Sequence, residues 1–138
     1  MKKIAVIGTG LSALSLAYHL PALDITFFEK SWRPGGRIST RKHNQYAFDH
    51  GAHYLKLDHG VIGLNEYLNK IDAIKILKGQ FCSNILQNSP IEDKEIIVGK
   101  EGNESIPINI HKSLHYPTYF SKQISSIETI NKEYYLIA

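Results

Sequence analysis

The feature that most constrains this chain is a glycine-rich turn between a short apolar run and a helix-forming run near the N-terminus. Residues 4–7 are apolar, which suits a strand buried on both faces as in a parallel sheet. Gly8, Gly10 and Ala13 have the G-x-G-x-x-G/A spacing. Ala17 lies one helical turn after Ala13, and both are small enough to let the helix pack closely on the strand. The pattern predicts a strand, a tight turn and a helix whose N-terminus faces a pyrophosphate.

A secretory signal peptide is the competing interpretation, because the lysines at 2–3 precede a run rich in small and apolar residues. The downstream residues argue against it. After a helix stop at 20–21, residues 24–29 are typical of a second strand, which ends on a carboxylate. Glu29 follows Gly8 at about the 20-residue distance from which an acidic side chain reaches the ribose hydroxyls of a dinucleotide. Because a carboxylate repels a 2′-phosphate, FAD or NAD is favoured over NADP.

Composition indicates one ordinary globular domain that is short for an enzyme enclosing both a dinucleotide and a substrate. No apolar run reaches the roughly 18 to 20 residues that cross a membrane, so no membrane partner is expected. The net charge of +3 comes from scattered lysines, which does not favour nucleic-acid binding. Cys82 is the single cysteine, which suits a reducing cytoplasm, and burial as a small hydrophobe is favoured over a reactive thiol.

A second glycine-rich turn follows Glu29 after five residues. Pro34, Gly35 and Gly36 predict a turn, and its position after a ribose-binding carboxylate places it near the same ligand. Arg37 would then direct a planar, permanently charged guanidinium at the pyrophosphate. The alternative interpretation is a surface turn flanked by solvated arginines.

Together these motifs resemble the N-terminus of flavin-containing amine oxidases, and above all the renalase-like bacterial oxidoreductases. Residues 46–54 look like the F-D-H-G-A-Q-Y-F segment of that family, in which an Asp-x-Gly turn passes close to the flavin. His53 stands where the family usually has glutamine. The resemblance implies an α/β, Rossmann-like FAD/NAD(P)-binding fold. It also implies FAD as cofactor and hydride removal from an amine or a reduced nicotinamide-like small-molecule substrate.

The motifs and the resemblance also assign cofactor-binding residues, and they leave the catalytic residue unassigned. In the family, the backbone at the position of Ile124 meets the adenine. His50 and His53 are the only titratable pair near the expected flavin, and hydrogen-bonded structural roles are favoured over proton acceptance for both. The residues expected at the cofactor are Gly8, Gly10, Leu11, Ser12, Ala13, Glu29, Lys30, Gly35, Gly36, Arg37, Gly51, Ala52 and Ile124.

The middle of the chain carries a weaker pattern, which is interpreted as an excursion into the substrate region. Residues 74–77 predict a short core strand, and 81–82 and 96–98 are strand-like pieces. An apolar stripe at helical spacing precedes them, and it consists of Val61, Leu64, Leu68 and Ile71.

A further helix is predicted to start at Ser105, with a proline in its first turn. Ile106, Ile110 and Leu114 form its expected buried side. His111 and His115 are spaced i, i+4, but no third ligand accompanies them, so a solvated helix face is favoured over a metal site.

The last residues predict a β-hairpin joined near 131–132. Its first strand would contain Ile124, Ile127 and Ile130, and its second strand residues 134–137. The expected organisation is a dinucleotide-binding core at 1–54, a partial substrate-side excursion at 55–117 and a returning hairpin at 118–138.

Three functional hypotheses remain open. The leading one is an FAD-dependent oxidoreductase, of which this chain is the N-terminal portion or a shortened descendant. We expect such an apparently incomplete fold to bind flavin weakly and to self-associate or need a partner chain, because unpaired apolar strands invite association. One rival is a non-catalytic flavin- or nucleotide-binding module. The other rival is an NAD-binding dehydrogenase module, a hypothesis that gives residues 35–37 no role.

Overall fold

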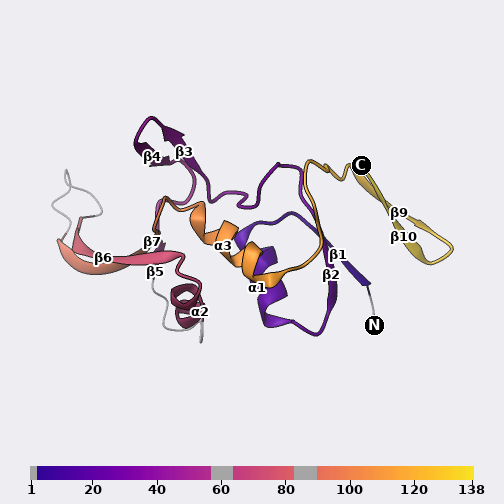
Figure 1. Cartoon of the computed structure of the whole chain (residues 1–138), viewed down its shortest axis with the longest axis horizontal. Coiled ribbons are helices and arrows are strands. Elements are labelled where there is room, and N and C mark those ends of the chain that lie inside the picture. Colours follow the sequence, from indigo (N-terminus) through magenta and orange to yellow (C-terminus); the bar gives the residue numbers. More distant parts are fainter. Residues whose placement is uncertain (1–2, 57–63, 83–89) are drawn as a thin grey trace. The chain divides into compact units, whose positions relative to one another are not determined.

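The computed structural model describes residues 3–56, 64–82 and 90–138 of the chain (Figure 1). Two compact units are present. The first comprises Met1–Ile38 and Pro107–Ala138, and the second comprises Ser39–Ile106. Within the described residues, no helix is long and apolar enough to cross a membrane. The predicted division into 1–54, 55–117 and 118–138 stays a prediction.

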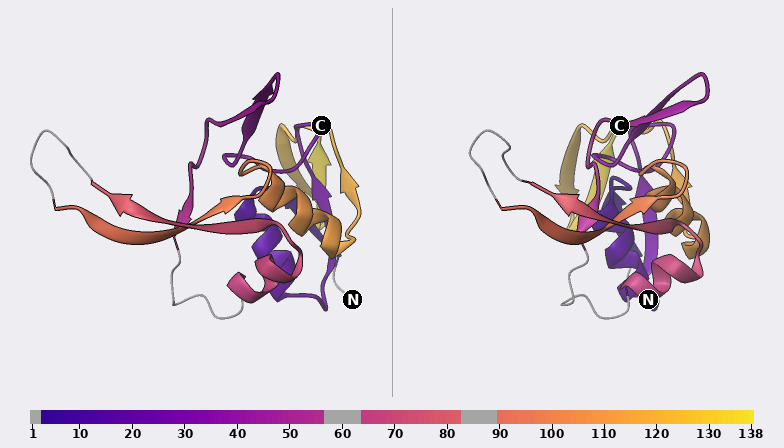
Figure 2. Two further views of the ribbon diagram at one scale, coloured as in Figure 1. Left: turned by 60° about the vertical axis from the view of Figure 1, so that its left-hand side comes forward. Right: turned by 90° about the vertical axis from the view of Figure 1, so that its left-hand side faces the viewer.

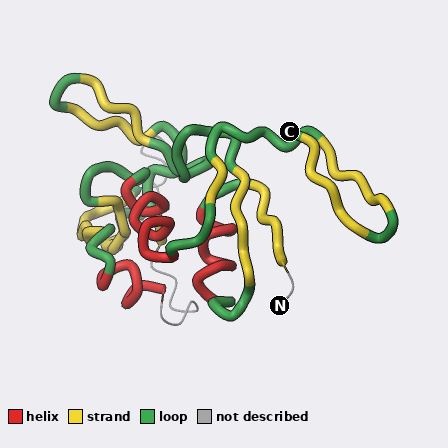
Figure 3. The backbone as a smooth tube through the Cα atoms, turned by 45° about the vertical axis from the view of Figure 1, so that its right-hand side comes forward, coloured by secondary structure: helices red, strands yellow, loops and turns green. Residues whose placement is uncertain are grey.

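The first unit is built on a three-stranded parallel sheet. β1 (Lys3–Ile7) pairs with β2 (Asp24–Phe28), which in turn pairs with β8 (Thr118–Tyr119). Helix α1 (Leu11–His19) connects β1 to β2, and Figure 3 draws it beside these strands. The helix buries Leu14 and Ala17. This strand, turn, helix and strand is the Rossmann-like arrangement that the glycine-rich turn predicts.

Helix α1 ends where the sequence predicts. Leu20 follows its last residue, and the Leu20 N–H still donates to the Leu16 carbonyl at 3.1 Å. Pro21 comes next and offers no N–H to continue the ladder. The predicted helix stop is confirmed.

The expected burial of the first strand is wrong. β1 alternates between exposed and half-buried residues, and Ile7 is 50% exposed. In the described sheet β1 has one neighbouring strand, whereas β2 has two. The fully buried position therefore belongs to β2, where Ile25 and Phe27 have no exposed surface. The apolar run correctly marked a parallel strand, but an apolar run does not fix the number of neighbours.

Helix α3 (Ser105–Leu114) forms at the predicted residues. Ile106 and Ile110 are buried and Leu114 is partly covered, which confirms the expected apolar side. Ser105 is the first helical residue, as predicted, and its hydroxyl donates to the Ala73 carbonyl at 3.3 Å.

The predicted C-terminal hairpin is confirmed as β9 (Ser126–Ile130) and β10 (Glu133–Ile137). The two turn residues Asn131 and Lys132 have positive φ angles of 53° and 67°, as a type I′ turn requires. Ile124 precedes β9, so its expected place inside the first strand is wrong.

The second unit holds the remaining strands. β3 (Thr40–His43) and β4 (Tyr46–Asp49) form an antiparallel hairpin. A second antiparallel sheet has the order β5-β7-β6, and Figure 2 shows the long ribbon made by β6 and β7. The bounds of these elements are Leu55–Lys56 for β5, Ile74–Phe81 for β6 and Glu92–Gly99 for β7.

The strands β6 and β7 are longer and more exposed than the sequence suggests. The predicted short strands at 74–77 and 96–98 belong to eight-residue strands. Ile74 and Ile97 are buried, but Ile76 and Leu77 are exposed, because the far part of the ribbon pairs through its backbone without covering its side chains.

Two further expectations concern the same unit. Helix α2 (Leu64–Lys70) carries the buried Leu68 and is followed by the half-buried Ile71, while Val61 lies outside the described residues. Cys82 directly follows β6 and is exposed, so the expectation that it is buried is wrong.

Candidate dinucleotide-binding site

The first glycine-rich turn lies where β1 and β2 end. Gly8 has a φ of +94°, which side-chain-bearing residues rarely adopt, and its N–H donates to the Phe28 carbonyl at 2.7 Å. Gly10 is the N-cap of α1, and its carbonyl accepts the first helical hydrogen bond from the Leu14 N–H at 3.1 Å. The turn therefore lies at the carboxyl edge of parallel strands, which is where α/β sheets bind ligands.

The start of α1 is open to a ligand. Apart from Gly10 itself and its two chain neighbours, no described atom lies within 4 Å of the position that a Cβ on Gly10 would take. Gly10 also supplies no side-chain cap, so the first-turn N–H groups of Leu11, Ser12 and Ala13 have no side-chain acceptor from the N-cap. These donors, at the positive end of the helix dipole, can bind an anion.

The second glycine-rich turn packs against the first. The Gly35 N–H donates to the Thr9 carbonyl at 3.1 Å, and Gly10 and Gly35 form a parallel bridge. A Cβ on Gly36 would lie 3.4 Å from the Gly10 Cα. Backbone therefore meets backbone at this point, so the two turns can share one ligand. Arg37, the next residue, is exposed.

Glu29 joins the same site from the end of β2. Its side chain is almost fully buried, with the residue 5% exposed. Oε2 accepts hydrogen bonds from the Thr9 N–H at 2.8 Å and from the Thr9 hydroxyl at 2.7 Å. Oε1 accepts one from the Ser31 N–H at 2.8 Å. Lys30, beside it in the chain, is exposed.

The hydrogen bonds decide the charge of Glu29. Burial by itself would raise the pKa of this carboxyl. The hydrogen bonds from the Ser31 N–H, then from the hydroxyl and N–H of Thr9, and last from the Ser31 side chain together outweigh burial and hold the pKa below its ordinary value of 4.5. Glu29 is therefore ionised at neutral pH.

A late segment of the chain returns to this carboxylate. The Glu29 N–H donates to the Tyr119 carbonyl and the Lys122 N–H donates to the Glu29 carbonyl, both at 2.9 Å. The Phe28 and Tyr119 rings stack with centroids 5.3 Å apart. Ile124, two residues beyond Lys122, is half-buried. The first unit thus brings together both glycine turns, Glu29 and the segment that leads to Ile124.

Gly51 and Ala52 belong to the second unit, where a partly buried polar network reaches the Ala52 carbonyl. Asp49 Oδ1 accepts hydrogen bonds from the Thr40 hydroxyl at 2.5 Å and from the Asn103 N–H at 2.8 Å. The Asn103 side-chain amide donates to the Ala52 carbonyl at 2.8 Å. His50 is exposed, with its Nε2 3.1 Å from the Ser39 hydroxyl. His53 is exposed.

Sequence reasoning missed three well-placed residues. Thr9 occupies a variable position of the glycine motif, so nothing in the spacing singles it out. Thr40 and Asn103 are each 2% exposed, and their partners lie far away in the sequence. The sequence offered two signals. Thr9 lies inside the glycine motif, and Asn103 lies between turn residues and the start of a helix.

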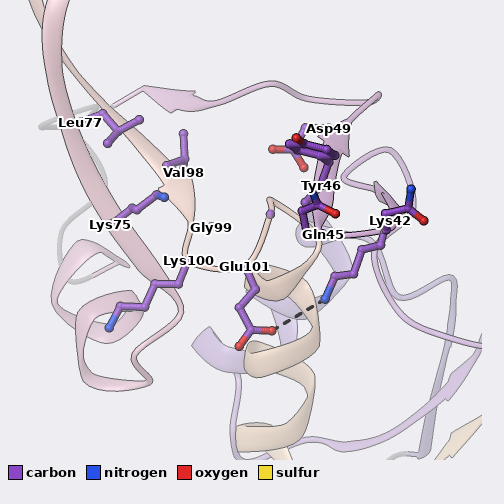
Figure 4. A pocket seen from close by; sticks show the side chains of 13 residues that line it. Lys42, Gln45, Tyr46, Asp49, Lys75, Leu77, Val98, Gly99, Lys100 and Glu101 are labelled. Atoms are coloured by element: carbon purple, nitrogen blue, oxygen red, sulfur yellow. Dashed lines mark ion pairs between the residues drawn. The ribbon is translucent and has the colours of Figure 1, made fainter.

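The second unit also contains an open pocket of about 560 Å³, shown in Figure 4. Lys42 on β3 reaches the Glu101 carboxylate at 3.8 Å, and Lys100 pairs with Asp72. The pocket wall is thus mixed in charge and selects no ligand class. Its lining residues are Lys42, Asn44, Gln45, Tyr46, Ala47, Asp49, Lys75, Leu77, Val98, Gly99, Lys100, Glu101 and Gly102.

His111 is not on a solvated helix face, which corrects the prediction. Its Nε2 lies 2.7 Å from the Thr118 hydroxyl, and its ring contacts Phe27 and Phe120 with centroid separations of 6.3 and 5.5 Å. Burial lowers the pKa of His111. His115 is exposed, and the described residues contain no group of three metal-ligating side chains.

Comparison with known proteins gives matches over the same residues. Residues 6–69 match the family described as NAD(P)-binding Rossmann-like domain. Coproporphyrinogen III oxidase of Staphylococcus aureus (strain NCTC 8325 / PS 47) is 43% identical over 54 residues, which are 36% of this chain and 12% of that protein. A Drosophila melanogaster protein named "Possible lysine-specific histone demethylase 1" is 44% identical over 125 residues, 88% of this chain and 13% of that protein.

Solved structures show the same fold. Wild-type putrescine oxidase bound to putrescine superposes with a TM-score of 0.68 at 11% identity, covering 99% of this chain and 55% of that one. An oxidoreductase from Methanosarcina mazei gives a TM-score of 0.63 at 12% identity, with 99% and 57% coverage. The chain thus spans about an eighth of these curated relatives and just over half of these structures. Residues 6–69 thus match a Rossmann-like domain, and the chain is similar in sequence to coproporphyrinogen III oxidase and the possible histone demethylase, and similar in fold to putrescine oxidase.

Proposed function

We propose that this chain binds FAD through the adenosine diphosphate part of the cofactor and serves an oxidoreductase of the amine oxidase type. The observation that carries the proposal is the meeting of three elements at the ends of β1 and β2. These are the 8–10 turn, the 35–36 turn packed against it, and the ionised Glu29. An anion-binding backbone beside a carboxylate is the combination that an adenosine diphosphate group requires.

The residues present fit such a group. The first-turn N–H groups of α1 would hold the pyrophosphate, and the space before Gly10 leaves room for the backbone to approach it. Glu29 would accept a hydrogen bond from the ribose. Arg37 would add a charge-assisted contact from the second turn. Ile124 would meet the adenine at the end of the returning segment.

FAD, when bound, supplies a two-electron acceptor for a hydride from an amine or a reduced nicotinamide-like substrate. The residues of this chain bind and orient the cofactor. Glu29 stays ionised and therefore disfavours a second negative group at the ribose. The similarity to amine and porphyrinogen oxidases supports oxidation as the reaction class.

The decisive experiment is a binding and spectroscopic test. The chain is purified, incubated with FAD, passed through gel filtration and scanned for the visible absorbance bands of oxidised flavin. Titration with FAD, NAD and NADP then ranks the three cofactors. We expect FAD to bind more tightly than NAD, and NADP to bind least. A chain that binds NAD but no FAD is instead a dehydrogenase module, and one that binds no nucleotide contradicts the proposal.

Catalysis is measured separately on the FAD-loaded chain. Peroxide production with amines or with NADH reports oxidase turnover. FAD binding without turnover would leave the cofactor site intact and would identify the chain as a non-catalytic flavin-binding module.

A further inference from the structure

Thr9 makes contacts that the dinucleotide pattern does not require. Its position is the variable residue of the first Gly-x-Gly, where many side chains are accepted. In this chain Thr9 is fully buried, and both its N–H and its hydroxyl donate to Oε2 of Glu29, at 2.8 and 2.7 Å. One oxygen of the carboxylate is therefore fixed by one residue of the phosphate-facing turn.

Counting acceptor positions shows what remains for a ligand. An ionised carboxylate offers about four lone-pair positions, two on each oxygen. Thr9 occupies both positions on Oε2. Ser31 donates its N–H to Oε1 at 2.8 Å, and its side chain also hydrogen-bonds the carboxylate. Because Ser31 is exposed and Thr9 is buried, a ribose hydroxyl can replace the Ser31 hydroxyl on Oε1 but cannot replace Thr9 on Oε2.

We infer that Thr9 is a positioning residue for ribose recognition. It holds Oε2 of Glu29 so that Oε1 alone is offered to a single ribose hydroxyl of a bound adenosine diphosphate group. The inference rests on the proposed function, because it concerns the ribose of the same ligand. The same role makes Thr9 responsible for discrimination against a 2′-phosphate. Because Thr9 holds the Glu29 carboxylate beside the ribose, the carboxylate cannot rotate away from an added phosphate and repels it. The lowered pKa of Glu29 agrees with a carboxylate that stays charged in this place.

The first test replaces the hydroxyl without changing the shape of the side chain. Thr9→Val removes the Oγ1 donor and keeps the N–H, and Thr9→Ser keeps both. Thr129→Val on the exposed strand β9 is the matched control for the chemical change. Circular dichroism checks that each variant is folded.

Binding of ADP, and of ADP with an added 2′-phosphate, is measured for each protein by calorimetry. We expect Thr9→Val to bind ADP about tenfold more weakly, the loss typical of one charge-assisted hydrogen bond. We also expect its preference for ADP over the 2′-phosphorylated ligand to narrow. Thr9→Ser and Thr129→Val should stay within about twofold of wild type.

A second measurement tests whether a ligand can use only one acceptor position of Glu29, the one on Oε1. If only Oε1 is offered, removal of one ribose hydroxyl should weaken binding much more than removal of the other. Wild-type affinities for 2′-deoxy-ADP and 3′-deoxy-ADP give this comparison. Equal, large losses with both ligands would contradict the single-hydroxyl arrangement.

A third readout needs no ligand. The Glu29 carboxyl is titrated by carbon NMR in wild type and in Thr9→Val, where loss of the hydroxyl should raise its pKa. If wild type binds neither ADP nor FAD, the proposed function fails and the ribose role of Thr9 fails with it. If wild type binds ADP and Thr9→Val binds it equally well with an unchanged Glu29 pKa, the role of Thr9 alone is refuted.

Discussion

Gly35→Ala should damage the fold and the site far more than the same change at the next residue. Gly35 has a φ of +142°, and a Cβ there would lie 2.7 Å from the Ile38 carbonyl oxygen. Gly36 has a φ of +59°, a left-handed value that alanine adopts at moderate cost, and its Cβ would lie 3.4 Å from the Gly10 Cα. Both residues belong to the same turn, so they form a matched pair.

The magnitudes follow from these two geometries. At Gly35, the backbone strain costs about 1–3 kcal/mol, and the overlap with backbone oxygen adds about 1–3 kcal/mol. If the two terms add at their middle values, the free energy of unfolding falls by about 4 kcal/mol. At Gly36, the left-handed conformation costs alanine about 1–2 kcal/mol, with little steric addition.

The assay is urea denaturation of wild type and both variants. Trp32 is the single tryptophan and lies in the first unit, so its emission reports on the unit that contains the turn. Circular dichroism provides a second probe. ADP binding should weaken more in Gly35→Ala than in Gly36→Ala, because displacement of residue 35 disturbs its hydrogen bond to the Thr9 carbonyl. Equal destabilisation by the two changes would refute the reasoning from the Ile38 contact.

Three further predictions concern charge and association. Arg37→Ala should weaken FAD binding about ten- to a hundredfold, while Arg41→Ala should change it little; equal losses would indicate a diffuse positive field. Because the folded-state pKa of Glu29 lies below 4.5, its contribution to stability is present above that pH and is lost as pH falls through the folded value. Urea midpoints from pH 7 to 3 should therefore fall more steeply in wild type than in Glu29→Gln, and parallel curves would contradict this. Tyr134 is 79% exposed on the apolar hairpin, so we expect the chain to self-associate and Tyr134→Lys to lower its mass in light scattering, whereas a monomeric wild type would oppose the idea.

Backbone features that neighbouring residues encode could be predicted from the sequence. The turn at Gly8 and Gly10 follows from glycine spacing, and the hairpin turn at 131–132 follows from flanking strand patterns. The stop of α1 follows from Pro21. In each case the physical cause lies within a few residues of its effect.

Features that depend on distant neighbours could not be predicted. Burial of β1 depends on how many strands flank it, which its own apolar run does not encode. The Thr9 hydroxyl became important only because folding placed Glu29 beside it. His111 looked solvated on its own helix, and Phe27 and Phe120 from other segments cover it.

The discontinuous make-up of the first unit has a consequence for the order of folding. β2 receives its second neighbour only when β8 arrives roughly 90 residues later, so the sheet has a high contact order. Closing so long a segment adds little to the equilibrium cost, since each doubling of length costs only about 0.6 kcal/mol. The cost appears instead in the rate of folding. During synthesis on the ribosome, residues 39–106 emerge before β8, so the sheet cannot yet be completed. Until β8 is made, one edge of β2 has no partner strand. The two glycine-rich turns at 8–10 and 35–36 are synthesised early, but the segment that leads to Ile124 joins them late.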